Sequence, residues 1–424
     1  MRNAASINNN KRMARSVSFK GDASRRSLHL GIDVPLLLIV ITLLIFGLLM
    51  VYSASWDYSL MVLGREPTYM FVRQLIWMGV GLLLAGFFTF VNYHRLRQLA
   101  VPMMVFAVGA LLLVLMVNEV INNAARTLWG GSIQPSELAK LATVIYLSVW
   151  MFSKREQLGD VSFGLIPLSA ILGIVGGLIF VQPDLSAAIT IFLLGGVLFF
   201  LGGGDLRQIA LLLILAVVIG WLVIRVHPTG SIRIVEYLRG LDDLTLAPYH
   251  LSRSLEALVK GGWFGVGIGL ADTKLTGLPV PPTDSIFAVV AEETGIVGAS
   301  ILVILFALLM WRGLVIAKNA PDGLGKILAA GLSVWITMEA IINMAVIVGL
   351  MPFAGNALPF ISAGGSNLVV SLIAIGILMN ISRLASQSKE EEKRSFDTVI
   401  DLRRRDSRRR VPRSGSSTKA YLKW

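Results

Sequence analysis

Long apolar stretches separated by short polar segments make up most of the chain. A helix needs about 20 predominantly apolar residues to cross the hydrocarbon core of a bilayer. Stretches of this kind, the fourth of them short, lie at residues 34–52, 72–91, 98–117, 137–152, 164–181, 185–202, 208–226, 286–311, 328–349 and 367–384. They are too long for barrel strands and do not alternate, and lipid cannot satisfy an open backbone. The pattern therefore predicts an all-α polytopic membrane protein with about ten transmembrane helices.

The composition agrees with this prediction. Hydrophobic residues make up 55% of the 424 positions, charged residues only 15%, and the mean hydropathy is +0.73. Soluble domains carry about 25% charged residues. The chain has no cysteine, and its histidines are not spaced like metal ligands, which excludes disulfides and thiol catalysis and argues against a zinc site.

Lysine and arginine gather at alternate ends of the apolar stretches, which indicates the orientation of the chain. Both terminal tails are basic, and the C-terminal tail contains the run RRRDSRRR at 403–410. The connections expected on the same side carry Arg95, Arg97, Lys154, Arg155, Arg207, Arg312, Lys318 and Lys326. The sequence predicts a basic cytoplasmic tail at 1–33, a membrane domain at 34–384 and a second basic cytoplasmic tail, disordered, at 385–424.

The net charge of +12 does not indicate a nucleic-acid partner. The excess lies largely in the two tails, next to membrane ends, where each cation gains about 1 kcal/mol from anionic head groups. Anionic lipids are therefore the expected partners of the tails. A docking role for the C-terminal tail is the alternative.

The opposite side carries one long connection, an extracytoplasmic loop at 227–285. A loop of this length is more often functional than passive. Its middle reads YHLSRSLEALVKGGWFGVGIG, which predicts an amphipathic helix followed by a glycine-rich turn. The glycines lack the Lys-Ser/Thr of a P-loop and the strand–helix frame of a dinucleotide site, so no nucleotide site is predicted.

Charged residues inside or beside the apolar stretches need an explanation, because burying a charge in lipid is costly and usually functional. Glu137 and Lys140 lie three residues apart on one helical face, and Asp184 and Asp284 precede the sixth and eighth stretches. Structural explanations are also open. Glu137 and Lys140 could neutralise each other after a helix start at Pro135, and Asp184 could cap a helix.

Two more carboxylates, Glu292 and Glu293, lie two helical turns beyond Asp284. They could form an interior polar pair satisfied by neighbouring helices, or they could support a donor or acceptor site. The segment LPFISAGGSNLVV at 358–370 is a Gly-Ser turn before the tenth stretch and could simply start a helix.

Four segments occur in order along the chain: QPSELAK at 134–140, QPDL at 182–185, TDSIFAVVAEETG at 283–295 and LPFISAGGS at 358–366. Together they resemble the motifs of the SEDS family (shape, elongation, division and sporulation), which includes RodA, FtsW and SpoVE. The resemblance covers about residues 34–384. The long basic tails favour an FtsW-like, division-type member.

The resemblance implies an enzyme that polymerises lipid II into glycan strands at the outer face of the bacterial plasma (inner) membrane and releases undecaprenyl pyrophosphate. It also implies a class B penicillin-binding protein as partner, within the membrane proteins of the divisome or the elongasome. Asp284 matches the essential aspartate of the family. Further family motif positions match Arg126, Glu137, Lys140, Asp184 and Ser366.

A carboxylate at Asp284 suits this reaction as a general base, since the attacking sugar hydroxyl must lose its proton. The leaving pyrophosphate gains negative charge, so cations should gather beside it. Arg126 and Lys140 are the candidates. Arg253 and Lys260, on the amphipathic segment, are further candidates that could equally form a solvated face. A divalent cation could assist instead, although the scattered carboxylates do not specify a site.

The chain departs from the family pattern near the aspartate. Family members usually read LPE-x-HTDF, whereas Val280, Pro282 and Ser285 replace the Glu, His and Phe here. A usual Tyr is Ala363, and a usual Trp in an outer loop is Thr127. Either the site has drifted with its function intact, or the substrate or activity has changed.

Two functions of other classes remain open. A lipid II flippase would also use intramembrane charges and broken helices, although no inverted repeat pairs the two halves of the chain. A non-catalytic scaffold that recruits a penicillin-binding protein would keep its role without Asp284. An enzyme releases undecaprenyl pyrophosphate and the other two do not, so product release separates them.

Overall fold

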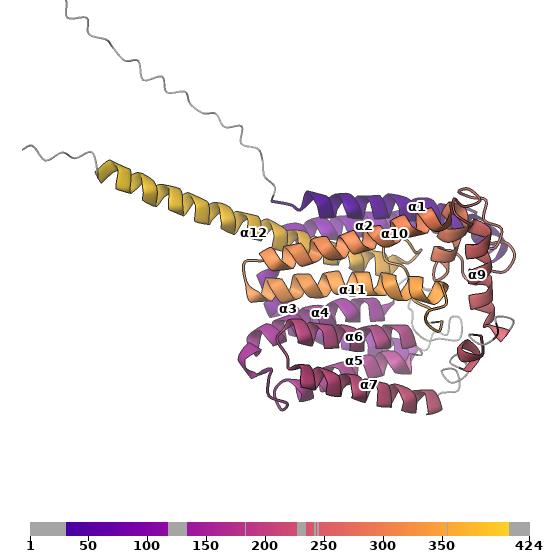
Figure 1. Ribbon diagram of the computed structural model, residues 1–424, viewed down its shortest axis with the longest axis horizontal. Coiled ribbons are helices and arrows are strands. Elements are labelled where there is room, and N and C mark those ends of the chain that lie inside the picture. The colour runs from indigo at the N-terminus through magenta and orange to yellow at the C-terminus, as the bar shows by residue number, and fades with distance from the viewer. Residues whose placement is uncertain are drawn as a thin grey trace, which may run out of the picture. The chain divides into compact units, whose positions relative to one another are not determined.

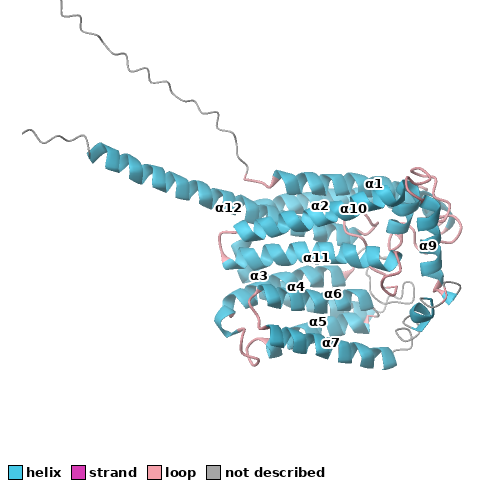
Figure 2. Cartoon of the chain, viewed as in Figure 1, coloured by secondary structure: helices cyan, strands magenta, loops and turns pink. Residues whose placement is uncertain are grey.

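A computed structural model describes residues 31–117, 134–182, 184–226, 235–240, 243, 246–353 and 355–406. Within these residues every regular element is a helix (Figure 2), which confirms the predicted all-α fold class. Figure 1 shows the long helices running side by side through the described part of the chain.

The long helices follow the apolar stretches of the sequence. Their bounds are α1 Val34–Met61, α2 Tyr69–Phe90, α3 Leu96–Val117, α4 Pro135–Ser153, α5 Leu165–Val181, α6 Leu185–Leu201, α7 Leu206–Val226, α9 Tyr249–Gly261, α10 Ile286–Asn319, α11 Gly323–Ile347 and α12 Gly365–Asp406, with short 3-10 turns at Tyr93–Arg95 and Arg155–Gln157. Each predicted stretch coincides with one of these helices, and α9 is the amphipathic helix predicted in the loop at 227–285. Residues 246–278 of that loop are called here the outer segment.

Six of the described helices are long and apolar enough to cross a membrane: α1, α2, α3 with the turn before it, α10, α11 and the first part of α12. Three shorter apolar helices, α5, α6 and the first half of α7, accompany them. The number of ten spans and the cytoplasmic location of the tails therefore stay predictions.

Three helices extend past the apolar stretch that predicted them. α1 continues to Met61, α10 to Asn319 and α12 to Asp406. The added part of α12 is rich in Glu, Lys and Arg, which are strong helix formers, so the helix can continue beyond its apolar part. Residues 385–406, predicted to be disordered, are helical here.

Aspartate side chains fix where two helices begin. Asp33 Oδ1 accepts a hydrogen bond of 3.0 Å from the amide of Leu36 at the start of α1, and Asp322 Oδ1 accepts one of 2.7 Å from the amide of Gly325 in α11. These are N-cap bonds, which satisfy amides that have no partner within the helix. Asp33 also forms an ion pair with Arg312 of α10 at 2.5 Å, joining α1 to α10.

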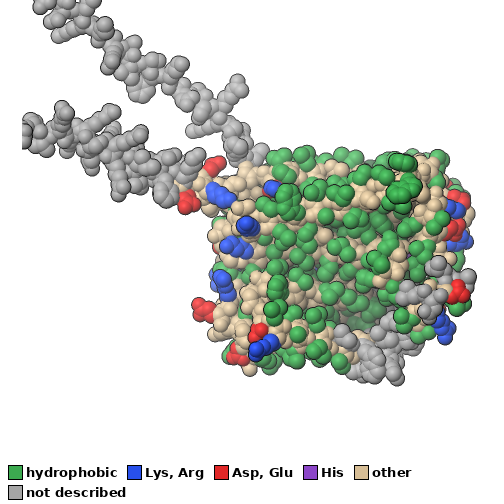
Figure 3. Space-filling model, in the orientation of Figure 1, with side chains coloured by type: hydrophobic (Ala, Val, Ile, Leu, Met, Phe, Trp, Pro, Cys, Tyr) green, Lys and Arg blue, Asp and Glu red, His purple; other side chains and the backbone are tan. Residues whose placement is uncertain are grey.

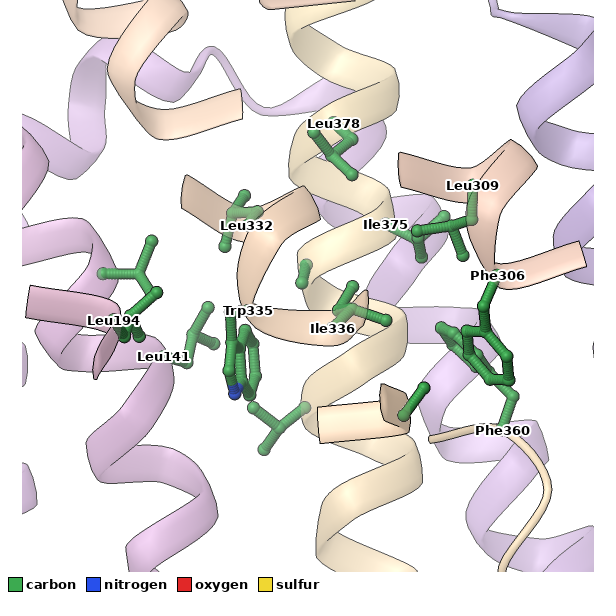
Figure 4. Close-up of a cluster of buried hydrophobic side chains, with 14 of the residues drawn as sticks. Leu141, Leu194, Phe306, Leu309, Leu332, Trp335, Ile336, Phe360, Ile375 and Leu378 are labelled. Atoms are coloured by element: carbon green, nitrogen blue, oxygen red, sulfur yellow. The ribbon is translucent and has the colours of Figure 1, made fainter. Parts of the chain in front are cut away.

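α11 and α12 form the interior of the bundle and are the most buried of the six apolar helices. α12 packs most extensively against α2, while α11 packs against α10, α4 and α6. Figure 4 shows part of this core, with side chains of α11 flanked by those of neighbouring helices: Leu332, Trp335 and Ile336 between Leu141 and Leu194 on one side and Phe306, Leu309 and Ile375 on the other.

The outer surface of the helices is apolar. On the face drawn in Figure 3, hydrophobic side chains cover the area between two edges, and Lys, Arg, Asp and Glu side chains gather at those edges. Ile45, Leu83 and Met116 are examples of strongly exposed apolar side chains. Such an extensive apolar surface is unfavourable in water and matches the hydrocarbon core of a bilayer. The chain is a multi-pass membrane protein.

The outer segment folds back onto the start of α10. α9 runs across the ends of the long helices in Figure 1 and packs against α10. Backbone hydrogen bonds of 2.9 to 3.1 Å then join residues 262–267 to residues 292–297. The helical conformation of α10 is interrupted at Gly295 (φ 68°, ψ −172°), where residues 262–267 pack against it. A Cβ at Gly265 would lie 2.2 Å from the carbonyl oxygen of Glu293. Close backbone packing therefore explains these glycines.

Gly376 allows α12 to approach α2, because a Cβ at this position would lie 2.4 Å from the carbonyl oxygen of Ala85. We expect Gly376→Ala to separate the two helices and to lower the melting temperature in detergent by several degrees, since overpacking costs about 1–3 kcal/mol. Gly86→Ala is the matched control: no atom lies within 4 Å of the added Cβ, so its melting temperature should stay equal or rise. Equal melting temperatures for the two variants would contradict this expectation.

Candidate active site

Asp284 lies in a turn at residues 279–285, called here the Asp284 turn, which directly precedes α10. The segment 358–366 holds this turn through two hydrogen bonds. Ser362 Oγ donates to the carbonyl of Thr283 at 2.7 Å, and the backbone amide of Ala363 donates to the carbonyl of Pro282 at 2.8 Å. Two motif segments far apart in sequence are thus joined by one side chain–backbone and one backbone–backbone hydrogen bond.

The side chain of Asp284 is half-buried. A Cβ at Gly355 would lie 3.4 Å from Asp284 Oδ2, so the carboxylate faces the loop between α11 and α12. It also interacts electrostatically with Tyr58 near the end of α1. The carboxylate therefore lies where α1, this loop and the start of α10 meet, and its partial exposure suits a group that exchanges protons with a substrate.

Two buried asparagines connect the Asp284 turn to α11. Asn343 Nδ2 donates to the carbonyl of Asp284 at 3.0 Å and to the carbonyl of Asn356 at 2.5 Å. Asn356 Nδ2 donates in turn to the carbonyl of Glu339 at 3.1 Å. Asn343 and Glu339 are one helical turn apart, so the same face of α11 supports the Asp284 turn and carries the carboxylate of Glu339.

Lys140 lies at the centre of a buried charged group. Its Nζ is 2.9 Å from Glu137 Oε1 and also bonds Glu339 Oε1. Trp335 Nε1 donates to Glu339 at 2.9 Å, and Asn367 Nδ2 donates to Glu137 at 3.0 Å. We call these five residues the Lys140 cluster. Mutual pairing and the added hydrogen bonds offset the cost of removing three charges from water, and they join α4, α11 and α12.

The Lys140 cluster bears on two predicted substrate contacts. The side chain of Lys140 is 1% exposed and that of Glu137 is 6% exposed, so both lie inside the bundle. Either residue would contact a substrate only after the cluster rearranged. The alternative interpretation, in which Glu137 and Lys140 neutralise each other, matches this geometry, and Glu339 is a further member that the sequence did not identify.

Asp184 and Ser366 lie together around Gln134, the residue before α4. Gln134 Nε2 donates to Asp184 Oδ2 at 2.8 Å, and its backbone amide donates to Ser366 Oγ at 3.0 Å. Asp184 also accepts from the hydroxyl of Ser136 at 3.1 Å and from the amide of Ala187 at 3.2 Å, which makes it the N-cap of α6. The structure therefore brings three of the four motif segments together here, and their substrate-binding role stays a prediction.

Glu292 and Glu293 hold the outer segment on α10. Glu292 accepts a hydrogen bond from the amide of Thr273 at 3.2 Å and another from its hydroxyl. Glu293 accepts from the hydroxyl of Ser53 at 2.5 Å and from Lys274 Nζ at 2.9 Å. Both carboxylates are buried. Their partners come from α1 and from the outer segment, so the geometry supports an anchoring role, and direct contact with a substrate stays a prediction.

Arg253 and Lys260 form a surface ion-pair network on α9. Arg253 Nη1 lies 2.6 Å from Glu256, while Lys260 Nζ lies 3.1 Å from Glu256 and 2.9 Å from Asp272. Hydrogen bonds from Arg253 and Lys260 lower the pKa of Glu256, and the hydrogen bond to Asp272 raises the pKa of Lys260. This arrangement matches the solvated face considered in the sequence analysis, and contact with a pyrophosphate stays a prediction.

Arg126 lies outside the described residues. Among the described residues, no group of three or more His, Asp or Glu side chains is arranged to hold a metal ion. A role for a divalent cation stays a hypothesis without a defined set of ligands in this part of the chain.

His250 of α9 reaches the Asp284 turn. Its Nε2 lies 2.8 Å from Ser285 Oγ, and that hydroxyl donates to the carbonyl of Pro279 at 2.5 Å. The imidazole also packs on the ring of Phe353, with 4.0 Å between the ring centroids. Burial lowers the pKa of His250 to about 4, so the side chain is neutral at neutral pH.

Several residues of this site were missed by the sequence analysis: Glu339, Asn343, Asn356, Asn367 and His250. Glu339 carried a usable signal, since a carboxylate in the middle of an apolar stretch is rarely without a function. The asparagines are neutral and gave a weaker one. His250 gave none, because its partner Ser285 is 35 positions away and a single histidine on an amphipathic helix is usually solvated.

Comparison with known proteins shows the family to which the chain belongs. Residues 34–387 match a family model described as cell cycle protein, which covers FtsW, RodA and SpoVE. The chain belongs to this family, the SEDS family. It is 35% identical over 359 residues to stage V sporulation protein E of Bacillus subtilis, covering 82% of this chain and 96% of that protein. It is 37% identical over 358 residues to the probable peptidoglycan glycosyltransferase FtsW of Trichlorobacter lovleyi, covering 82% and 93%.

Two solved structures share the SEDS fold. One, described as the structural coordination of polymerization and crosslinking by a peptidoglycan synthase complex, matches with a TM-score of 0.69 and 27% identity, over 83% of this chain and 98% of that chain. The other is the rod shape determining protein RodA of Thermus thermophilus, with a TM-score of 0.60 and 27% identity, over 83% and 97%. This chain is therefore an FtsW-like SEDS protein with the RodA fold.

Removing the central charge of the Lys140 cluster should destabilise this SEDS protein. We expect Lys140→Met to lower the free energy of unfolding by about 3–5 kcal/mol, because two buried carboxylates lose their cation. Adding Glu339→Gln to this variant should recover part of the loss by removing one carboxylate. Thermal denaturation in detergent measures both, with Lys154→Met at the exposed end of α4 as control. A Lys140→Met protein as stable as this control would contradict the expectation.

The burial of His250 makes stability depend on pH. A histidine in the unfolded chain titrates near pH 6.5, whereas burial lowers the pKa of folded His250 to about 4. The unfolded state therefore binds a proton that the folded state excludes, and stability falls as the pH drops from about 6.5 to about 4. We expect the melting temperature of wild type to fall more steeply over this range than that of His250→Gln, which does not titrate. Parallel curves for the two proteins would contradict this.

Proposed function

We propose that this SEDS protein is a peptidoglycan glycosyltransferase that polymerises lipid II into β-1,4 glycan strands at the outer face of the bacterial plasma membrane. Two relatives, 37% and 34% identical over 82% and 83% of this chain, are named probable peptidoglycan glycosyltransferase FtsW. The observation that carries the proposal is the half-buried carboxylate of Asp284, on a turn whose backbone carbonyls accept hydrogen bonds from α11 and from the 358–366 segment.

In the proposed reaction Asp284 is the general base. The 4-hydroxyl of the acceptor sugar transfers its proton to the carboxylate while its oxygen attacks the anomeric carbon of the donor. The bond between that carbon and the pyrophosphate oxygen breaks, and undecaprenyl pyrophosphate leaves with the electron pair. Attack from the opposite face inverts an α-linked donor and gives the β-1,4 link. A positioned base of this kind contributes about 10²- to 10⁴-fold to the rate.

The negative charge on the leaving pyrophosphate calls for cations near the membrane surface. Arg253 and Lys260 lie on the outer segment and are partly exposed, so they can reach a polar head group without leaving the protein surface. Lys140 is enclosed by its carboxylates and needs a rearrangement to take part. Arg126 keeps its predicted role beside them.

The proposed partner is a class B penicillin-binding protein that cross-links the product. The support is the fold match, at a TM-score of 0.69, to a chain of a peptidoglycan synthase complex that coordinates polymerization and crosslinking. Lipid II and the growing strand are the proposed substrates, and the membrane proteins of the divisome are the proposed wider assembly, in line with the FtsW-named relatives. An elongasome role is the alternative.

The test is polymerisation of labelled lipid II by purified protein, with its penicillin-binding protein, in liposomes. We expect glycan polymer and released undecaprenyl pyrophosphate from wild type, and a rate lower by about 10²-fold or more from Asp284→Asn, which keeps the shape of the side chain but cannot take up a proton. Glu66→Gln is the matched control, because Glu66 is an exposed carboxylate in the loop between α1 and α2, and it should polymerise like wild type.

Two outcomes would reject parts of this proposal. Equal polymerisation by wild type and Asp284→Asn would remove Asp284 from the chemistry. A folded wild-type complex that moves lipid II across the bilayer without releasing undecaprenyl pyrophosphate would instead identify a flippase.

A further inference from the structure

The Asp284 turn has an unusual backbone. Val280 adopts a positive φ of 44°, which is rare for a residue other than glycine and unfavourable for a β-branched one. A conformation of this kind persists where the surrounding structure holds it in place. Pro281 and Pro282 follow Val280 directly, so the path of the chain from Val280 to Asp284 has little freedom to adjust.

The two ends of the turn are tied together by one hydroxyl group. Ser285 Oγ lies 2.5 Å from the carbonyl oxygen of Pro279 and 2.8 Å from Nε2 of His250. A carbonyl oxygen can only accept, so the single hydroxyl proton of Ser285 goes to Pro279. The hydroxyl must then accept from His250, which fixes the imidazole as the tautomer with its proton on Nε2. We call this chain of two hydrogen bonds, from His250 to Ser285 and from Ser285 to Pro279, the clasp.

The clasp is enclosed. Ser285 is 0% exposed and His250 is 9% exposed, and the ring of Phe353 packs on the imidazole at 4.0 Å between centroids. Water therefore competes poorly for these hydrogen bonds, and each donor and acceptor would cost free energy if its partner were removed. Phe353 belongs to the same loop as Gly355, which faces the carboxylate of Asp284.

We propose that His250 is a positioning residue for Asp284, and that through the clasp α9 sets the direction of the Asp284 carboxylate. The hydrogen bonds from α11 and from the 358–366 segment hold carbonyls of residues 282–284 in the middle of the turn. The clasp adds the closure of the ends, at Pro279 and Ser285, on either side of the strained Val280. The outer segment is then a structural part of the active site.

This inference rests on the proposed function of Asp284 as the base, and the expected effect is therefore on turnover. A misplacement of a reacting group by about 1 Å can lower the rate by about 10²-fold. We expect Ser285→Ala and His250→Phe to lower kcat for lipid II polymerisation by about 10- to 100-fold, with KM changed less than about threefold. Phe keeps the ring that packs on Phe353 but lacks the donor.

Two further variants separate the hydrogen bond from packing. His250→Gln places an amide donor close to the position of Nε2 and should keep kcat within about threefold of wild type. Ser254→Ala is the matched control for loss of a buried serine hydroxyl, because Ser254 is a fully buried residue of α9 whose hydroxyl has no hydrogen-bond partner among the described residues. It should behave like wild type. All variants are assayed at one temperature, which lies below the lowest melting temperature in the set.

Hydrogen–deuterium exchange of the same proteins gives a readout that does not depend on activity. The amides of the Asp284 turn should exchange faster in Ser285→Ala and His250→Phe than in wild type, His250→Gln or Ser254→Ala. If wild type made no polymer, the proposed function would fail, and this exchange pattern would still decide whether the clasp holds the turn.

Three results would overturn the proposal. The first is a kcat in Ser285→Ala and His250→Phe equal to that of wild type. The second is a His250→Gln protein as slow as His250→Phe, which would assign the effect to ring packing. The third is unchanged exchange of the Asp284 turn in both clasp variants.

Discussion

Lys140 is a full positive charge inside a bundle of apolar helices, and the arrangement of those helices depends on how it is neutralised. Its two carboxylate partners come from α4 and α11, and Asn367 of α12 donates to both of them, at 3.0 Å to Glu137 and 3.5 Å to Glu339. An unpaired charge in such an interior would be far more costly than a lost apolar contact, so the three helices cannot separate or slide without a large penalty. The apolar side chains around Trp335 fill the space, while the charges fix the register.

The same face of α11 connects the Lys140 cluster to the Asp284 turn. Glu339 belongs to the Lys140 cluster, and one turn further Asn343 bonds the carbonyl of Asp284, with Asn356 between them. A rigid helix thus links the charged interior to the candidate base. The outer segment is attached as firmly, because Glu292 and Glu293 bond residues of that segment and its backbone packs into the opening of α10 at Gly295. Catalysis by positioned groups requires that the surrounding structure hold them rigidly in place.

One departure from the family pattern, Ser285, has a structural role here. Ser285, in place of an aromatic residue, donates its hydroxyl proton to the carbonyl of Pro279 across the Asp284 turn and accepts a hydrogen bond from His250. Pro282, in place of a histidine, accepts a hydrogen bond through its carbonyl, a bond that any residue at this position could make. Val280 holds a positive φ that is unfavourable for a β-branched residue, and nothing in the structure explains a valine at this position. The replacements change the side chains around Asp284, while the backbone carbonyls of residues 282–284 are held by hydrogen bonds from α11 and from the 358–366 segment.

The sequence by itself determined the helices, the all-α membrane class and the family. Apolar runs long enough to cross a bilayer predict membrane helices, and four short motifs in a fixed order indicate the family. Neither prediction requires knowing which helices are in contact. Asp284 was predicted as the base in the same way, and that role stays a prediction. Only the tertiary structure decided the partners. Lys140 and Glu339 are 199 positions apart, and His250 and Ser285 meet only because α9 folds back across the bundle. Periodicity along a helix shows which side is apolar, but the requirement that each buried polar group find a partner is met across helices, and that pairing is set by packing in three dimensions.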